Sequence, residues 1–225
     1  MEGADPLTGD PPDVVPVPGR VDADVREEFP ELALVTATLE AEPGRSPDGV
    51  RERLRGLSDR FRGSHAVTMR QDPIPWAYRV FYRHVGLDPD ADRTPVEAAA
   101  VERLLRGGFK SRNIVDDALT IAVVETGVPV WALDSDRVEG ELTIRVADAN
   151  EPLGRGSGAL PLPSGRLVVA DEAGPVAQLF SAPAEGVGVT RKTRRITLFS
   201  VQVANVPAIH VEEALHTCVD VLRAR

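Results

Sequence analysis

The chain has 225 residues, of which 42% are hydrophobic and 27% charged, a composition typical of a globular protein and not of a peptide or linker. Its formal net charge of -9 argues against a surface that is basic throughout, although it leaves room for a local cationic patch. No stretch approaches the roughly 18 apolar residues of a membrane span, and the first residues lack the pattern of a secretory signal, so we expect a cytoplasmic protein without membrane contact.

The opening segment, residues 1–19, contains five prolines and several aspartates, a composition that favours a disordered acidic tail. Residues 20–225 are expected to form a single domain. Its first strand is predicted at residues 32–39, a short and partly β-branched apolar run that is bounded by Pro30 and by Pro43-Gly44.

Helices dominate the next part of the chain. The segment Thr94-Pro95-Val96-Glu97 has the pattern of a capping box, and Gly107-Gly108 ends the helix that it opens. An aromatic stripe on the helix before it is interpreted as core. Four helices are predicted where apolar residues recur at helical spacing: residues 46–61, 75–86, 94–107 and 113–125.

After Gly127-Val128-Pro129 the pattern changes to short β-like runs, followed by a closing amphipathic helix with apolar positions from Ile209 to Leu222. Helices in the first half and strands in the second favour an α+β domain over alternating βαβ units. The strands are predicted at residues 142–146, 166–170, 176–180 and 195–203.

The usual signatures of metal, nucleotide and nucleophile chemistry are missing. The single cysteine, Cys218, excludes an internal disulfide and is interpreted as a buried helix residue. The closest histidine pair, His210 and His216, has a spacing that does not place two rings on one helix face. The loop 154–158 has glycines but lacks the lysine of a phosphate loop, and no nucleophile elbow is present. We therefore predict neither a metal nor a cofactor, and assign no catalytic residue.

The sharpest charge feature is a cationic cluster directly before the predicted strand 195–203. Its cations could bind a phosphate backbone. They fit equally well the charged protection of an edge strand, and both interpretations stay open. The four cations are Arg191, Lys192, Arg194 and Arg195.

From Gly108 to Ile196, and more loosely from Trp76, the sequence resembles a known family. The matching pieces come in a specific order and spacing: SRNIVDD at 111–117, TGVPVWALD at 126–134, DRVEG at 136–140, IRVA at 144–147, LVVAD at 167–171 and GVTRKT at 188–193. They resemble the tRNA-binding and editing module, called B3/B4, of the phenylalanyl-tRNA synthetase beta subunit and its free-standing relatives.

This resemblance implies an α+β domain with a β-sandwich of unusual topology, flanked by helices and containing a pocket between its halves. In the synthetase that pocket hydrolyses tyrosine wrongly attached to the phenylalanine tRNA. The reaction needs a bound ester, a positioned water and donors to the oxyanion, but no protein nucleophile. A free-standing relative is expected to bind an aminoacyl ester or an aminoacylated tRNA end, and as an enzyme it would hydrolyse mischarged tRNA.

The pocket positions of the family are altered in this sequence. Trp131 stands in place of a histidine, Leu119-Thr120 in place of a Thr-Asn pair, and Phe199 in place of a glutamate. Residues 179–183 replace a glycine-rich loop. Since an unpaired buried polar group costs about 1 to 3 kcal/mol, the loss of the glutamate favours a more apolar ligand, or none.

The resemblance leaves three polar candidates for substrate contact, Arg112, Asn113 and Thr120, with Arg79 as an addition. Trp131 and Phe199 are the predicted pocket walls, although a plain core position is the alternative for Trp131.

Four further charged residues that match the family are interpreted as structural: Asp117, Asp134, Arg137 and Asp171. The cluster 191–195 favours tRNA as the partner. The rival hypothesis is a non-catalytic module, for a small amino-acid-like molecule or for another protein, that keeps the fold after losing the editing residues.

Overall fold

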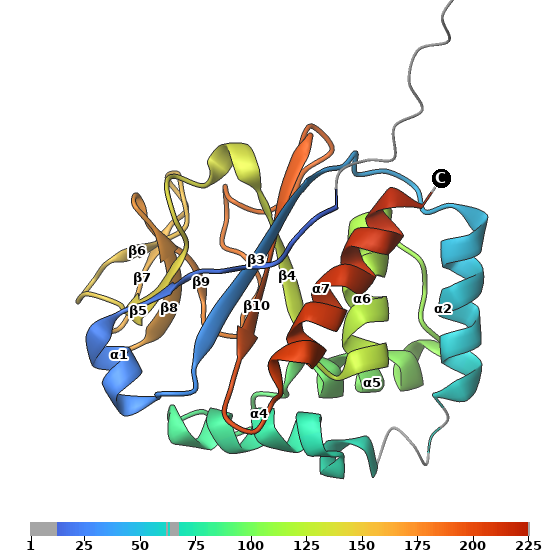
Figure 1. Cartoon of the computed structure of the whole chain (residues 1–225), viewed down its shortest axis with the longest axis horizontal. Coiled ribbons are helices and arrows are strands. Elements are labelled where there is room, and N and C mark those ends of the chain that lie inside the picture. Colours follow the sequence, from blue (N-terminus) through green and yellow to red (C-terminus); the bar gives the residue numbers. More distant parts are fainter. Residues whose placement is uncertain (1–12, 62, 64–67, 225) are drawn as a thin grey trace, which may run out of the picture.

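The computed structural model of the protein describes residues 13–61, 63 and 68–224. Two four-stranded sheets pack face to face, and helices cover the outer face of the first sheet (Figure 1). The predicted α+β class is confirmed. Residues 1–12 of the predicted tail lie outside the described residues. Its predicted end at residue 19 is wrong, because β1 (Val17–Pro18) pairs with Val35 and Thr36.

The first sheet has the order β1-β3-β10-β4 and is antiparallel throughout. Its central strand is β10, which pairs with β3 on one side and with β4 on the other, so that Phe199 lies between Thr36 and Trp131. The predicted strands 32–39 and 195–203 are confirmed. Besides β1, the strands are β3 (Ala33–Glu40), β4 (Val130–Asp134) and β10 (Arg195–Gln202).

The second sheet has the order β2-β5-β8-β9, in which the β2–β5 pair is parallel and the others are antiparallel. The predicted strand at 176–180 starts earlier and ends at Gln178, which leaves Phe180 in the following turn. The strands are β2 (Arg20–Val21), β5 (Thr143–Val146), β8 (Leu167–Asp171) and β9 (Gly174–Gln178), beside a small hairpin of β6 (Pro152–Leu153) and β7 (Leu160–Pro161).

Most of the predicted helices are confirmed, but the one expected at 75–86 spans residues 73–84, and a short helix at residues 23–28 was not predicted. Thr94 and Glu97 form the predicted capping box, and Gly107 ends the same helix in the left-handed conformation at φ +70°. Among the described residues, no helix has the length and apolarity to cross a bilayer. The helices are α1 (Ala23–Glu28), α2 (Asp48–Arg60), α4 (Pro73–His84), α5 (Pro95–Arg106), α6 (Ile114–Thr126) and α7 (Ala208–Arg223), with short turns η1 (Met69–Gln71) and η2 (Ser135–Arg137).

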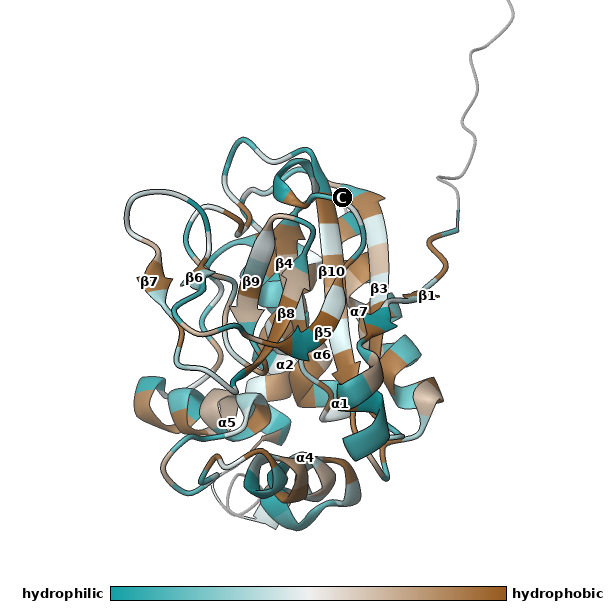
Figure 2. Ribbon diagram, turned by 90° about the vertical axis from the view of Figure 1, so that its left-hand side faces the viewer, coloured by the Kyte–Doolittle hydropathy of each residue, from teal (hydrophilic) through white to brown (hydrophobic). Residues whose placement is uncertain are grey.

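The helix pair α6 and α7 packs on the outer face of the first sheet. Cys218 of α7 is fully buried there, its Sγ 3.6 Å from the carbonyl oxygen of Ala118, and burial raises the pKa of its thiol. The interpretation of Cys218 as a buried helix residue is confirmed. Ile209 is 64% exposed, so the buried face of α7 begins at Val211. Hydrophobic colouring follows the strands of both sheets (Figure 2).

Candidate functional site

Two of the residues predicted to line a pocket, Trp131 on β4 and Phe199 on β10, are direct cross-strand neighbours. Their rings stack with centroids 5.4 Å apart and planes 18° apart. Both are buried, with 8% and 1% of their surface exposed. Because successive residues on a strand alternate between faces, Phe199 shares its face with Thr36, on the side of the first sheet turned to the second sheet.

Phe180, from the turn after β9, closes the space above these rings. Its ring lies 6.2 Å from that of Trp131 and stacks on Tyr82 at 5.0 Å, and Tyr78 and Phe81 of α4 meet it edge-on. Its φ of +64° is unusual for a residue with a side chain and turns the ring inward. The aromatic stripe of α4 is therefore core, as predicted, and the place expected to hold a pocket is packed with rings.

The three polar candidates lie on the other side of the first sheet, at the start and along the length of α6 (Figure 1). Asn113 caps α6, its Oδ1 accepting from the backbone N–H groups of Val115 and Asp116 at 3.0 Å each. Thr120 donates to the carbonyl of Asp116 at 2.8 Å. Arg112 forms an ion pair with Glu102, and its side chain is 47% exposed. Their contact with a substrate stays a prediction.

Arg79 lies inside the protein with 4% of its surface exposed, paired with the carboxylates of Asp90 at 2.6 Å and Glu97. Burial alone would lower the pKa of this guanidinium, but the hydrogen bonds and charges of the two carboxylates outweigh burial and raise it. Arg79 thus ties α4 to α5 and to the loop between them.

Buried aspartates hold the loops at the ends of the strands and helices. Asp117 accepts from Ser46 at 2.5 Å, from Ser111 at 2.6 Å and from the backbone of Arg112 at 2.9 Å. The bonds from Ser111 and Arg112 fix the turn that leads into α6, and the bond from Ser46 ties α6 to the segment before α2. They agree with the structural interpretation of Asp117.

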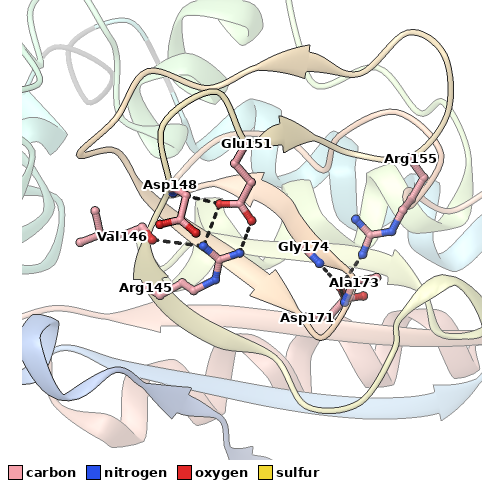
Figure 3. A network of polar contacts seen from close by, with 8 residues as sticks. All are labelled: Arg145, Val146, Asp148, Glu151, Arg155, Asp171, Ala173 and Gly174. Atoms are coloured by element: carbon pink, nitrogen blue, oxygen red, sulfur yellow. Dashed lines mark hydrogen bonds and ion pairs between the residues drawn. The ribbon is translucent and has the colours of Figure 1, made fainter.

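Asp171, at the end of β8, has the same function for the second sheet. It accepts from the backbone N–H groups of Glu139, Ala173 and Gly174, and Arg155 forms an ion pair with it (Figure 3). Arg155 belongs to the glycine-containing segment 154–158, which is a loop, as predicted. Asp171 therefore ties β8 to two neighbouring loops.

The cationic cluster lies on the turn before β10 and on the first residue of that strand, residues 190–195, which we call the basic turn. Thr193 fixes it from within, donating to the buried Asp134 at 2.7 Å and accepting from the backbone of Thr190 at 3.0 Å. The turn is anchored from outside by the backbone N–H of Ala41, which donates to Arg194 at 3.0 Å. The side chains of its cations therefore project from a fixed backbone.

All four cations of the basic turn are exposed, and within the described part of the chain Arg191 and Lys192 form no ion pair. Arg194 and Arg195 lie 3.6 and 3.5 Å from the carboxylates of Glu42 and Asp136. The edge-strand interpretation is wrong, because β10 is paired on both sides. It failed because strand neighbours are set by distant segments, which a local charge pattern does not report.

Next to the basic turn, a cleft of about 280 Å³ opens between the first sheet and the segment 138–142. Threonine hydroxyls lie on its sheet side, and we call it the threonine cleft. Thr38 and Thr197 lie 3.2 Å apart, and Thr197 is 2.8 Å from Ser135, which directly follows the anchor Asp134. The sequence signal for this cleft is the spacing of Thr36 and Thr38, two positions apart on β3, which puts both hydroxyls on one face. The threonines are Thr36, Thr38 and Thr197.

The B3/4 domain family model matches residues 77–217, more than half of the chain. The chain belongs to the B3/4 domain family. It is 34% identical over 98 residues to the phenylalanine–tRNA ligase beta subunit of Photorhabdus laumondii. The matched stretch covers 43% of this chain and 12% of the relative. It is 37% identical over 99 residues to that of Tropheryma whipplei, 44% of this chain and 10% of the relative. The match thus spans about an eighth or less of these relatives.

The matched part of this B3/4 domain, residues 77–217, runs from α4 into α7. It includes the stacked rings and the basic turn. Strand β3, with Thr36 and Thr38, lies outside it. One wall of the threonine cleft is therefore contributed by a part of the chain that the family model does not match.

In residues 13–61, 63 and 68–224 of this B3/4 domain, no three His, Cys, Asp or Glu side chains are grouped so as to hold a metal ion. His210 lies beside Glu213 at 3.4 Å, a pair within one helix turn. The predicted absence of metal also concerned His65, which falls outside the described residues.

Proposed function

We propose that this B3/4 domain binds an aminoacyl ester or the aminoacylated end of a tRNA, with the basic turn holding phosphates. The relatives that the chain matches are phenylalanine–tRNA ligase beta subunits. The observation that carries the proposal is the basic turn itself, four exposed cations on an anchored turn of a chain whose net charge is -9. Arginine suits this purpose, because its planar fork binds two phosphate oxygens at once.

The threonine cleft is proposed to hold the end of the ligand that follows the phosphates. It lies beside the basic turn, since Thr197 comes two residues after Arg195 on β10. A threonine hydroxyl both donates and accepts hydrogen bonds, which matches ribose hydroxyls and an ester carbonyl. The cleft therefore offers neutral polar contacts next to the cationic contacts of the turn.

Binding is tested with the full chain and a bulk aminoacylated tRNA preparation, by filter retention at several salt concentrations. The double variant Arg191→Gln/Lys192→Gln is compared with Arg55→Gln/Arg60→Gln on α2, which removes the same charge elsewhere. We expect the first variant to bind about tenfold more weakly and to lower the slope of log affinity against log salt by about two. Equal effects of the two variants would remove the basic turn from the proposal.

The finer proposal is hydrolysis, in which water attacks the ester carbonyl and the tRNA hydroxyl leaves. Arg112 is the candidate for this step, because its side chain is exposed and held by a single carboxylate, Glu102. Since Arg112 lies on the other side of the first sheet from the threonine cleft, this step requires the ester to bind at the start of α6, as an alternative to its binding in that cleft. The chain supplies a matched control, since Arg106 pairs with the same Glu102 oxygen at 3.2 Å. We expect Arg112→Gln, but not Arg106→Gln, to slow deacylation of a panel of mischarged tRNAs.

The second candidate function is a non-catalytic module, and the packing of Trp131, Phe199 and Phe180 favours it. Rings fill the space where the resemblance implies a pocket, so they leave little room there for a substrate. Binding of tRNA that depends on the basic turn, without turnover of any mischarged tRNA, would support the module and reject hydrolysis.

A further inference from the structure

A second cleft, of about 500 Å³, lies at the opposite end of the second sheet from the threonine cleft. Val146, the last residue of β5, lines this cleft, whereas Leu142, just before β5, lines the threonine cleft. We call it the end cleft. Its size lies within the range of small-molecule sites in proteins.

The lining of the end cleft is part polar and part apolar, and we call its apolar part the floor. Phe29, Leu87 and Leu179 come from three separate parts of the chain and line it together with Val146. The ring of Phe29 packs on Phe81 at 5.1 Å, so the floor is continuous with the core and is held in place. An apolar group of a ligand would be buried here against a fixed apolar surface.

The rim of the end cleft carries both signs of charge. Arg166 and Glu28 line it, and within the described residues neither side chain has a hydrogen-bond or ion-pair partner, not even the other one. The helix α4 ends at His84 beside the cleft, and the carboxyl end of a helix favours a nearby positive charge. The amide of Gln178 adds a neutral donor.

We propose that the end cleft binds a small zwitterion with an apolar side chain, of the class of free apolar α-amino acids. Arg166 receives the carboxylate, Glu28 the ammonium group, and the apolar floor receives the side chain. The assignment follows from charge complementarity: a cation and a carboxylate that do not neutralise each other flank one apolar surface. It does not depend on the binding of tRNA.

The ligand side of the proposal is tested by titration calorimetry of the full chain with L-leucine, L-leucinamide and N-acetyl-L-leucine. Leucinamide lacks the carboxylate and N-acetyl-leucine lacks the ammonium group. We expect L-leucine to bind at least about tenfold more tightly than either analogue, the ratio that one charged hydrogen bond provides. Absence of L-leucine binding at millimolar concentration, or equal binding of all three, would overturn the proposal.

The protein side is tested with Arg166→Gln and Glu28→Gln, two exposed rim positions. Matched controls are Arg26→Gln and Glu27→Gln, exposed residues of the same types that do not line the cleft. We expect each rim variant to weaken L-leucine about tenfold and to leave the affinity for the analogue lacking the corresponding charged group nearly unchanged. An equal loss in a rim variant and its control would place the binding site elsewhere. Since tRNA is absent from both titrations, their failure leaves the proposed function untouched.

Discussion

One face of the first sheet contains two stretches that differ in what fills the space above them. Phe199 and Thr197 are two residues apart on β10 and point the same way, yet the first is packed under rings and the second lines an open cleft. The backbone pairing is regular through both stretches. Side-chain volume, and not strand geometry, therefore decides where this sandwich is solid and where it leaves a cleft.

The largest effect is expected where the rings are removed. Phe199→Ala should lower the free energy of unfolding by about 3–5 kcal/mol, because a fully buried ring leaves a cavity that its neighbours fill only in part. Urea unfolding followed by circular dichroism measures the loss. A loss below about 1 kcal/mol would mean that the packing closes without the ring, and the contrast between the two stretches would fail.

A smaller effect is expected in the open stretch. Thr197→Val keeps the shape of the side chain but removes the hydroxyl that joins Thr38 and Ser135, and should cost about 1 kcal/mol in the same urea experiment. Thr36→Val is the comparison variant, since Thr36 lines the cleft outside this hydroxyl chain and loses only a long, exposed hydrogen bond of 3.4 Å to the carbonyl of Val17. If Thr197→Val proves as costly as the loss of Phe199, the cleft is a packed region and not a ligand space.

The smallest effect concerns the half-exposed loops beside the second sheet. The hydrogen bonds from Arg145 lower the pKa of Glu151, partly opposed by burial, and the backbone of Asp148 adds to the lowering (Figure 3). The folded pKa then lies below the unfolded value of about 4.3, so this stabilisation is complete above that pH and is lost as the pH falls through the folded pKa.

Between neutral pH and about pH 3, the free energy of unfolding should therefore fall further in the wild type than in Glu151→Gln. The difference between the two falls should be less than about 1 kcal/mol. Urea midpoints at a series of pH values measure the difference. Glu27→Gln, an exposed carboxylate on α1, serves as the control and should follow the wild type. Identical pH profiles for Glu151→Gln and wild type would show that the ion pair with Arg145 adds nothing to stability.

Much of the fold could be predicted from the sequence, because its signals are local. The capping box at Thr94 and the period of α7 depend on residues within a few positions of one another. The strand Val130–Asp134 was not predicted from its pattern, since its five residues are all buried and show no alternation. The short helix α1 was missed as well, because six residues give too few turns for a period.

The site was harder to predict than the fold, because it depends on which distant segments meet. The partners of Arg79 lie in the loop after α4 and in α5, and nothing within α4 points to them. The resemblance predicted Trp131 and Phe199 as walls of one pocket, and their rings do stack. That Phe180 would cover them depends on one backbone angle, which the glycine-free segment 179–183 gave no reason to expect.

The buried thiol of Cys218 offers a way to measure how often the helical layer opens. The chain has one thiol, and it lies fully buried between α6 and α7 with its ionisation suppressed. A thiol-specific reagent can then modify the protein only during moments when these helices separate, so the modification rate reports how often the helical layer opens. Ligands of either cleft could be compared by the delay they cause, without a label or an added residue.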